Sequence, residues 1–137
     1  MGIYIIRHGQ TELNSRQVLQ GRSDYPLNEA GIAQAEGAAR RLQGIRFDRV
    51  YTSPLRRAVQ TAEIVAPGVP QIVDRRLIEM DYGPYEGARL RELPPEVLTF
   101  FQDFVHNPAP DGMELLSSVE ARAGSFWKRF EAWRAIF

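Results

Sequence analysis

The sequence predicts an α/β fold with a mainly parallel central sheet. Short segments at 3–6, 48–52 and 71–77 are predicted strands, and predicted helices over 29–43 and 53–66 lie between them. This alternation predicts parallel strands joined by right-handed crossovers. In such sheets ligands bind outside the carboxyl ends of the strands, so the residues that follow each strand are the first candidates for a site.

The two helices between the strands have their own start and stop signals. Asn28 is a good N-cap for the alanine-rich helix over 29–43, and Gly44 is placed to end it. Ser53-Pro54 is a capping residue followed by a proline, which predicts that the next helix starts there.

The second half of the chain adds two more predicted helices. Pro94 or Pro95 opens one that runs toward His106, and the last runs from about Met113 to the terminus. The segment 9–27 has no clear period, and a loop of that length inside a compact domain is usually functional.

Composition bounds the class of protein. A chain of 137 residues suits a single domain. Basic and acidic side chains balance at 17 each, so no net field favours nucleic acid or an anionic membrane, and any anion site must be local. No cysteine is present, which excludes disulfides, a thiolate metal site and a cysteine nucleophile. No apolar run could span a bilayer and no secretory signal is visible, so a cytoplasmic enzyme is expected.

The exit of the first strand carries the most informative residues, Arg7 and His8. Guanidinium binds phosphate oxygens bidentately, and imidazole is easily held neutral and nucleophilic near pH 7. His106 is the only other histidine, and its position away from any strand exit predicts a structural or exposed side chain. We favour a functional His8 over a surface imidazole because the other strand exits also carry suitable groups.

Two arginines and an acid follow the second and third strands. Arg56 and Arg57 lie in the first helical turn, where a cation is disfavoured unless it faces a bound anion. We favour Arg56 for that role and leave Arg57 open between solvent and function. Glu79 is either a solvated loop carboxylate or an acid that protonates a leaving alkoxide.

Other candidates have structural alternatives. Asn14, Gln20 and Gly21 either form turns in the long loop or line the phosphate and the leaving group. Four aromatic residues share one face of the last helix, and this pattern is typical of core packing: Phe126, Phe130, Trp133 and Phe137.

Four motifs occur in order along most of the chain, from Ile5 to about Glu114. They are residues 7–12 with Asn14, residues 20–31, residues 52–62 and residues 77–87, followed by a Pro-Asp-Gly-Met-Glu turn at 110–114. Together they resemble the histidine phosphatase superfamily, the phosphoglycerate-mutase-like proteins. The resemblance implies a three-layer αβα fold with a mainly parallel central sheet.

The resemblance also implies roles. His8 would attack phosphorus and form a phosphohistidine, Arg7 and Arg56 would bind the phosphate oxygens, and Glu79 would give its proton to the leaving oxygen. The residues implied to contact phosphate or substrate are Asn14, Gln20, Gly21 and Tyr82. The implied partner is a small phosphorylated substrate, and no metal or cofactor is implied.

The chain departs from the family pattern after the last helix. Members of the family carry a second active-site histidine there, in a His-Gly motif after another apolar strand, whereas this sequence stops at Phe137. His106 cannot substitute for it by position. We therefore expect a sheet that lacks its C-terminal strand, an exposed edge beside residues 3–6 that would suit a homodimer, and low or no turnover.

The branch of the family follows from the short span between Gly87 and Pro110. It resembles the compact phosphatases, which include α-ribazole-5′-phosphate phosphatases of cobalamin synthesis. A cofactor-dependent phosphoglycerate mutase and a non-catalytic chain that binds phosphate or a partner remain alternatives. We expect one domain, 1–137, in which a cap-like insertion over 85–109 selects the substrate. Its apolar residues form either a wall for a ring-bearing leaving group or ordinary helix packing: Leu90, Leu93, Val97, Leu98, Phe100, Phe101 and Phe104.

Overall fold

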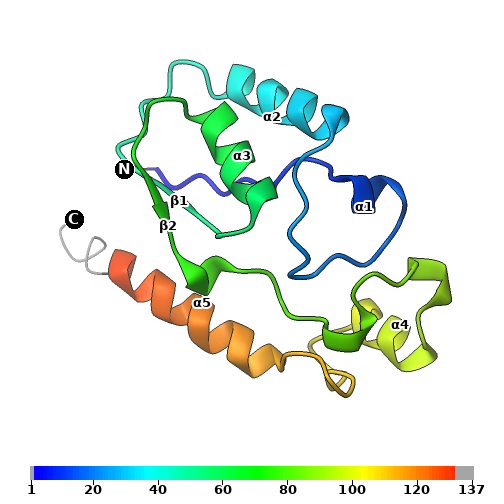
Figure 1. Cartoon of the computed structure of the whole chain (residues 1–137). Helices are drawn as coiled ribbons and strands as arrows, with labels where there is room; N and C mark the ends of the chain where they lie inside the picture. Colours follow the sequence, from blue (N-terminus) through cyan, green and yellow to red (C-terminus); the bar gives the residue numbers. More distant parts are fainter. Residues whose placement is uncertain (1, 132–137) are drawn as a thin grey trace.

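The computed structural model describes residues 2–131 (Figure 1). The regular elements in chain order are α1 (Glu12–Ser15), α2 (Glu29–Arg41), β1 (Val50–Thr52), α3 (Arg56–Val65), β2 (Gln71–Val73), α4 (Pro95–Gln102) and α5 (Leu116–Glu131). Short 3₁₀ turns lie at Arg75–Leu77, Gly83–Tyr85 and Leu90–Glu92. The predicted end of the last helix, with Trp133 and Phe137, lies outside the described residues.

The fold is α/β in three layers. β1 and β2 are parallel, with Val50 opposite Gln71 and Thr52 opposite Val73. Figure 1 shows α2 and α3 on one side of this pair and α5 on the other. On the α5 side, the Tyr51 ring packs edge-on against Phe126, with ring centroids 5.4 Å apart. The predicted class and the parallel strands are confirmed.

The prediction of a buried strand at residues 3–6 was wrong. The four side chains of this segment are 41–82% exposed, and within residues 2–131 no backbone hydrogen bond joins the segment to β1 or β2. A strand is defined by its hydrogen bonds to a neighbouring strand. Without such a neighbour, an apolar run leaves its backbone N–H and C=O groups without strand partners. The predicted third strand is also shorter, because Asp74 caps the 3₁₀ turn that follows β2.

The helix starts test the capping signals. The Asn28 side chain accepts from the backbone N–H of Gly31 at 2.9 Å, which confirms it as the N-cap of α2. α4 begins at Pro95, as predicted. α3 begins at Arg56 and not at Ser53-Pro54, because Leu55 is still extended and the Asp24 carboxylate accepts from the Arg56 N–H at 2.7 Å.

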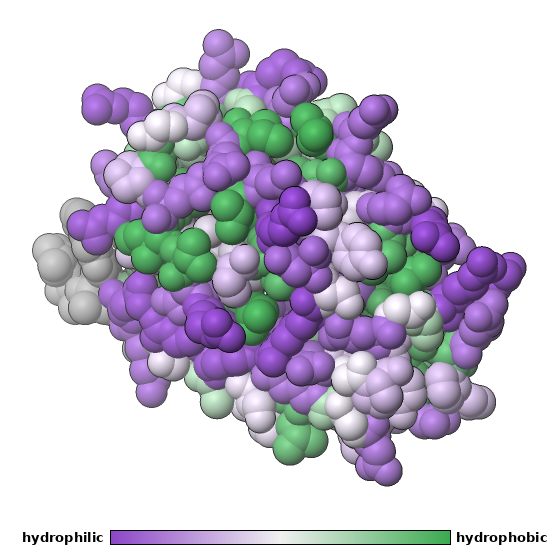
Figure 2. All heavy atoms as spheres, viewed as in Figure 1, coloured by the Kyte–Doolittle hydropathy of each residue, from purple (hydrophilic) through white to green (hydrophobic). Residues whose placement is uncertain are grey.

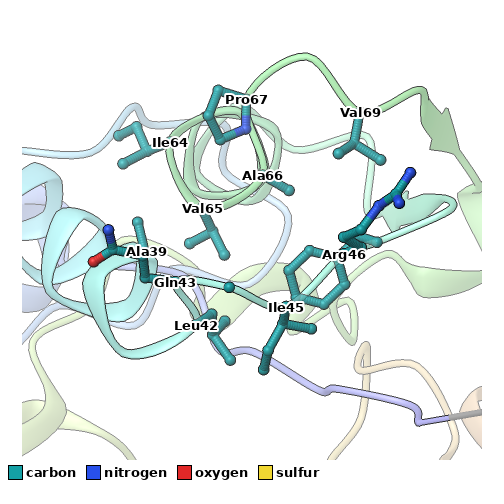
Figure 3. Close-up of a pocket in the computed structure, with 12 residues that line it drawn as sticks. Ala39, Leu42, Gln43, Ile45, Arg46, Ile64, Val65, Ala66, Pro67 and Val69 are labelled. Atoms are coloured by element: carbon teal, nitrogen blue, oxygen red, sulfur yellow. The ribbon is translucent and has the colours of Figure 1, made fainter.

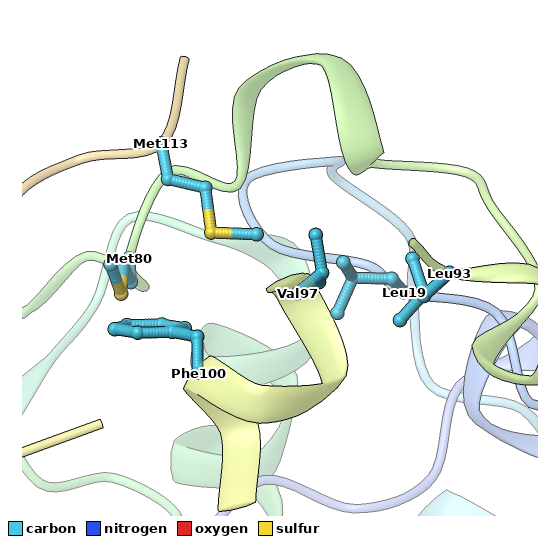
Figure 4. Close-up of a cluster of buried hydrophobic side chains, with 6 residues drawn as sticks. All are labelled: Leu19, Met80, Leu93, Val97, Phe100 and Met113. Atoms are coloured by element: carbon cyan, nitrogen blue, oxygen red, sulfur yellow. The ribbon is translucent and has the colours of Figure 1, made fainter. Parts of the chain in front are cut away.

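A hydrophobic core lies under α4 (Figure 4), formed by Leu19, Met80, Leu93, Val97, Phe100 and Met113. Three of the apolar residues of 85–109 therefore serve helix packing. The others are exposed, namely Leu90, Leu98, Phe101 and Phe104. Figure 2 shows that the surface in this view is largely hydrophilic with scattered apolar patches.

Two further observations concern the rest of the molecule. A mainly aliphatic pocket of about 430 Å³ lies between the ends of α2 and α3 and the loop after α2 (Figure 3), and it includes none of the predicted site residues. Among the described helices, none is long and apolar enough to cross a membrane.

Candidate active site

His8 and Arg57 form the centre of the site. His8 Nδ1 lies 2.7 Å from the carbonyl oxygen of Gly9, so Nδ1 carries the proton and donates it to that oxygen. The other ring nitrogen, Nε2, accepts from Arg57 Nε at 3.3 Å. This tautomer leaves a lone pair on Nε2, the nitrogen that faces the guanidinium.

The surroundings of His8 favour its neutral form. Burial lowers the pKa of the imidazole below its usual value of 6.5. The hydrogen bond to Gly9 and the charge of Glu79 raise this pKa, and the charges of Arg57 and Arg7 lower it, with a net downward shift. A neutral imidazole can act as a nucleophile through the lone pair of its unprotonated nitrogen, here Nε2.

The backbone next to His8 is held against two helices. The N–H of Gly9 donates to Thr61 Oγ1 at 3.1 Å, and that hydroxyl donates to the carbonyl of Arg57 one turn earlier in α3. A Cβ atom on Gly9 would collide with the carbonyl of Gly31 in α2, so the close approach of these backbones requires glycine at position 9. The imidazole is thus fixed relative to Arg57.

Arg57, and not Arg56, reaches the site. The side chain of Arg57 is 2% exposed, and its guanidinium donates to the carbonyls of Gly21 at 2.6 Å and Ser23 at 2.9 Å. The Arg56 side chain is exposed, and only the backbone N–H of Arg56 is bonded, to Asp24. The structure therefore brings Arg57, and not Arg56, into contact with His8.

The register of α3 explains why Arg57, and not the predicted Arg56, reaches the site. Its buried residues are Arg57, Thr61 and Val65, which are spaced at four-residue intervals and so share one face. This pattern could have been read from the sequence, because it separates position 57 from position 56.

Arg57 is a buried cation with neutral direct partners. Among residues 2–131 no carboxylate forms an ion pair with its guanidinium. Burial lowers the pKa of Arg57, and the more distant charges of Glu79, Asp24 and Glu86 counteract this effect. A buried cation without an anion in contact is suited to bind one.

The predicted polar residues of the 9–27 loop have structural contacts. Asn14 Oδ1 accepts from the backbone N–H and the hydroxyl of Thr11, both at 3.0 Å, and so caps α1. Gln20 is buried, and with its amide oxygen turned toward Arg57 it accepts from Nε at 2.8 Å, so the single Nε–H is shared between Gln20 and His8. Gln20 therefore contacts the guanidinium.

The acid-bearing segment lies close enough to act on both central residues. The carboxylate of Glu79 is exposed and accepts from the N–H of Met80 at 2.8 Å, and its charge raises the pKa of His8 and Arg57. Tyr82 is half-buried. Burial and the charges of Glu79 and Glu86 raise its pKa to about 12, so its hydroxyl remains a proton donor at neutral pH.

Two further predictions concern Arg7 and His106. Arg7 is exposed, and its charge is felt at His8. His106 is confirmed as exposed, with its ring nitrogen 2.7 Å from the Asp103 carboxylate.

The sequence profile of the histidine phosphatase superfamily (branch 1) matches residues 3–134. The chain belongs to this superfamily. It is 39% identical over 131 residues to a fructose-2,6-bisphosphatase TIGAR of Xenopus tropicalis, a match that covers 90% of this chain and 47% of that protein. It is 44% identical over 132 residues to a 2,3-bisphosphoglycerate-dependent phosphoglycerate mutase of Methylobacterium sp., covering 88% and 62%.

A solved histidine phosphatase has the same fold. The crystal structure of an alpha-ribazole phosphatase from Shigella flexneri superposes with a TM-score of 0.81 at 29% identity, covering 95% of this chain and 67% of that one. The chain spans about half to two thirds of the length of the curated relatives it matches.

Within this histidine phosphatase chain, Arg57 had been left open by the sequence, and two other contributors to the site were missed. Glu86 binds the backbone of residues 22 and 23, and Arg22 donates to the Glu79 carbonyl at 3.1 Å. Both side chains act on backbone atoms of irregular segments, where no periodic pattern marks them.

Proposed function

We propose that this chain carries the nucleophile and the phosphate-binding groups of a phosphomonoester hydrolase that works through a phosphohistidine at His8. The observation that carries the proposal is the hydrogen bond between an unprotonated Nε2 and the buried guanidinium of Arg57, which forms no ion pair with a carboxylate of residues 2–131. A phosphoryl group bound by the guanidinium would lie beside Nε2, the nitrogen that the guanidinium contacts.

The proposed reaction has two displacements. Nε2 of His8 attacks phosphorus, the bond to the ester oxygen breaks, and Glu79 gives its proton to that oxygen as the alcohol leaves. Glu79 then takes a proton from a water molecule that attacks the phosphohistidine, which releases inorganic phosphate and restores His8. Arg57 and Arg7 stabilise the charge on the phosphoryl oxygens, so catalysis is mainly positioning and electrostatics.

For the substrate we propose a phosphomonoester with a ring-bearing leaving group, such as α-ribazole 5′-phosphate in cobalamin synthesis. The supporting feature is the cap-like segment 85–109. Phe101 packs edge-on against Tyr82, with ring centroids 5.3 Å apart, and remains 36% exposed. Phe104, which like Phe101 packs against Phe100, is half-exposed. Apolar rings adjoining the phosphate site suit an aromatic leaving group. The likeness to alpha-ribazole phosphatase structures supports the same choice.

A second candidate is a phosphoglycerate mutase, favoured by the 44% identity to a protein of that name. The two candidates differ in the fate of the phosphohistidine. A hydrolase passes the phosphoryl group to water, whereas a mutase returns it to a phosphoglycerate. Following ³²P from a labelled substrate into inorganic phosphate or into phosphoglycerate distinguishes them.

We further propose that the 137-residue polypeptide turns over slowly. Within the described residues His8 is the only histidine at the site, because His106 is exposed and paired with Asp103. Family members with a second active-site histidine have one more cationic ligand at the phosphoryl group, and the loss of such a ligand weakens transition-state stabilisation.

The experiment is a phosphatase assay with p-nitrophenyl phosphate on a sample of verified mass, together with acid-quenched detection of phosphohistidine. Label at His8 with slow release of phosphate supports the proposal. Binding of phosphate with no label at His8 would favour the non-catalytic binding role, and turnover without label would overturn the mechanism.

A further inference from the structure

The carboxylate of Glu86 is bonded to four donors. Its Oε1 accepts from the backbone N–H of Arg22 at 2.8 Å and of Tyr82 at 3.3 Å. Its Oε2 accepts from the backbone N–H of Ser23 at 3.0 Å and from the Ser23 hydroxyl at 2.8 Å. Both oxygens are engaged in holding protein groups, which suits a positioning role.

The loop that Glu86 holds is the loop that holds Arg57. The N–H groups of residues 22 and 23 point to Glu86, whereas the carbonyls of Gly21 and Ser23 accept from Arg57 Nη2 and Nη1. Residues 21–23 thus connect the carboxylate of Glu86 to the buried guanidinium of Arg57. Arg57 in turn contacts His8.

Gly21 shows how closely Glu86 approaches the loop. Its φ of +51° lies in the left-handed region, and a Cβ atom there would collide with Glu86 Oε1 and approach Tyr82 Cδ2 to 2.9 Å. Only glycine allows the carboxylate to lie against this backbone.

The same loop is fastened to the acid-bearing segment. The Nε of Arg22 donates to the carbonyl of Glu79 at 3.1 Å, and its terminal nitrogens pair with Asp81 at 3.3 Å and Glu114 at 3.1 Å. A shift of the loop would therefore move the phosphate-binding guanidinium and the backbone of the proposed acid together.

We propose that Glu86 is a positioning residue of this site, which acts through residues 21–23 to hold Arg57 against His8 for phosphate binding. This inference rests on the proposed function. It predicts that loss of the Glu86 charge weakens phosphate binding although the carboxylate itself makes no contact with phosphate.

The experiment compares Glu86→Gln with Glu92→Gln, which removes the same charge at an exposed position of the same segment. Inorganic phosphate is titrated into each protein by calorimetry, and phosphorylation of His8 by p-nitrophenyl phosphate is followed in a single turnover. We expect Glu86→Gln to weaken phosphate binding about 10-fold and to slow phosphorylation about 10- to 100-fold, the range for a lost charge-assisted hydrogen bond. Glu92→Gln should stay within about 2-fold of the unaltered chain.

A double-mutant cycle separates positioning from general loss of structure. If Glu86 acts through Arg57, then Glu86→Gln should change phosphate affinity by less than about 2-fold when Arg57 is already alanine. Equal effects of Glu86→Gln with and without Arg57 would overturn the inference.

Ser23→Ala serves if Glu86→Gln does not fold. It removes one donor to the carboxylate and keeps the backbone contacts, and we expect about 3-fold weaker phosphate binding. Unchanged binding in Ser23→Ala would then overturn the inference. An unaltered chain that neither binds phosphate nor becomes phosphorylated would contradict the proposed function itself, and this inference with it. If the unaltered chain does both and Glu86→Gln matches Glu92→Gln, only the inference about Glu86 fails.

Discussion

The site around Arg57 and the proposed cap-like segment 85–109 are built by different means. In the site a buried guanidinium, an imidazole and the 21–23 loop are joined by hydrogen bonds between 2.6 and 3.3 Å. In the cap, apolar side chains divide between the core and solvent, with Phe100 2% exposed and Phe104 51% exposed. Hydrogen-bond geometry tolerates little change, whereas an exposed apolar surface can vary freely. The difference supports the proposal that the site around Arg57 carries the chemistry and that the cap selects the substrate.

The strongest test of the site around Arg57 removes the proposed nucleophile, His8. His8→Asn should abolish phosphohistidine and lower the phosphatase rate at least about 10³-fold, because no other histidine of the chain reaches the site. The measurement is the p-nitrophenyl phosphate rate together with acid-quenched labelling. His106→Asn is the matched control and should stay within about 2-fold of the unaltered chain. A labelled His8→Asn protein would refute the assignment.

The core side of the cap should respond in stability. Phe100→Ala empties a buried position next to Met80 in the core cluster and should lower the free energy of unfolding by about 3–5 kcal/mol. Phe104→Ala, at an exposed position, should cost less than about 1 kcal/mol. Urea unfolding followed by circular dichroism measures both. Equal losses would show that the cap does not divide into buried and exposed sides.

The neighbouring residues Arg56 and Arg57 provide the sharpest comparison within the site. Arg57→Ala should lower the phosphatase rate about 10²- to 10³-fold, the usual effect of removing one donor to a developing negative charge. Arg56→Ala should stay within about 2-fold, because its side chain is exposed and only its backbone is held. Steady-state rates on both variants, with melting curves to confirm folding, test the assignment. The reverse order would restore the prediction made from the sequence.

The electrostatics of the site around Arg57 can be tested by titrating His8. Burial lowers the pKa of His8, so the imidazole should remain neutral down to a pH below 6.5 and gain its proton only under more acidic conditions. The protonated form lacks the lone pair on Nε2, so the rate of His8 phosphorylation should fall as pH drops through that pKa. NMR of a ¹³C-histidine sample follows the titration, with His8→Asn to assign the signal. A midpoint at or above 6.5 would contradict the buried environment.

Local signals in the sequence predicted the parts of the fold that depend on local physics. Asn28 caps α2 because its side chain bonds to a backbone group three residues away. The sequence does carry a signal that separates position 57 from position 56, the four-residue spacing of Arg57, Thr61 and Val65. The start of α3, by contrast, depends on Asp24, which lies 32 residues earlier in the chain. The apolar run 3–6 predicted a strand, but strand formation depends on a neighbour that a local pattern cannot supply. Glu86 was missed for a related reason, since its partners are backbone amides of a distant loop.

The smallest expected effect is the one that bears on substrate. Phe101→Ala removes an exposed ring that packs against Tyr82, and it leaves His8 and Arg57 in place. We expect KM for α-ribazole 5′-phosphate to rise about 3- to 10-fold, as for one lost aromatic contact, while kcat for a small aliphatic phosphomonoester stays within about 2-fold. Leu98→Ala, which trims another exposed side chain of α4, is the control. If kcat falls equally for both substrates, Phe101 acts by supporting Tyr82 in the site around Arg57. The division between a fixed site and a variable cap then does not hold at this contact.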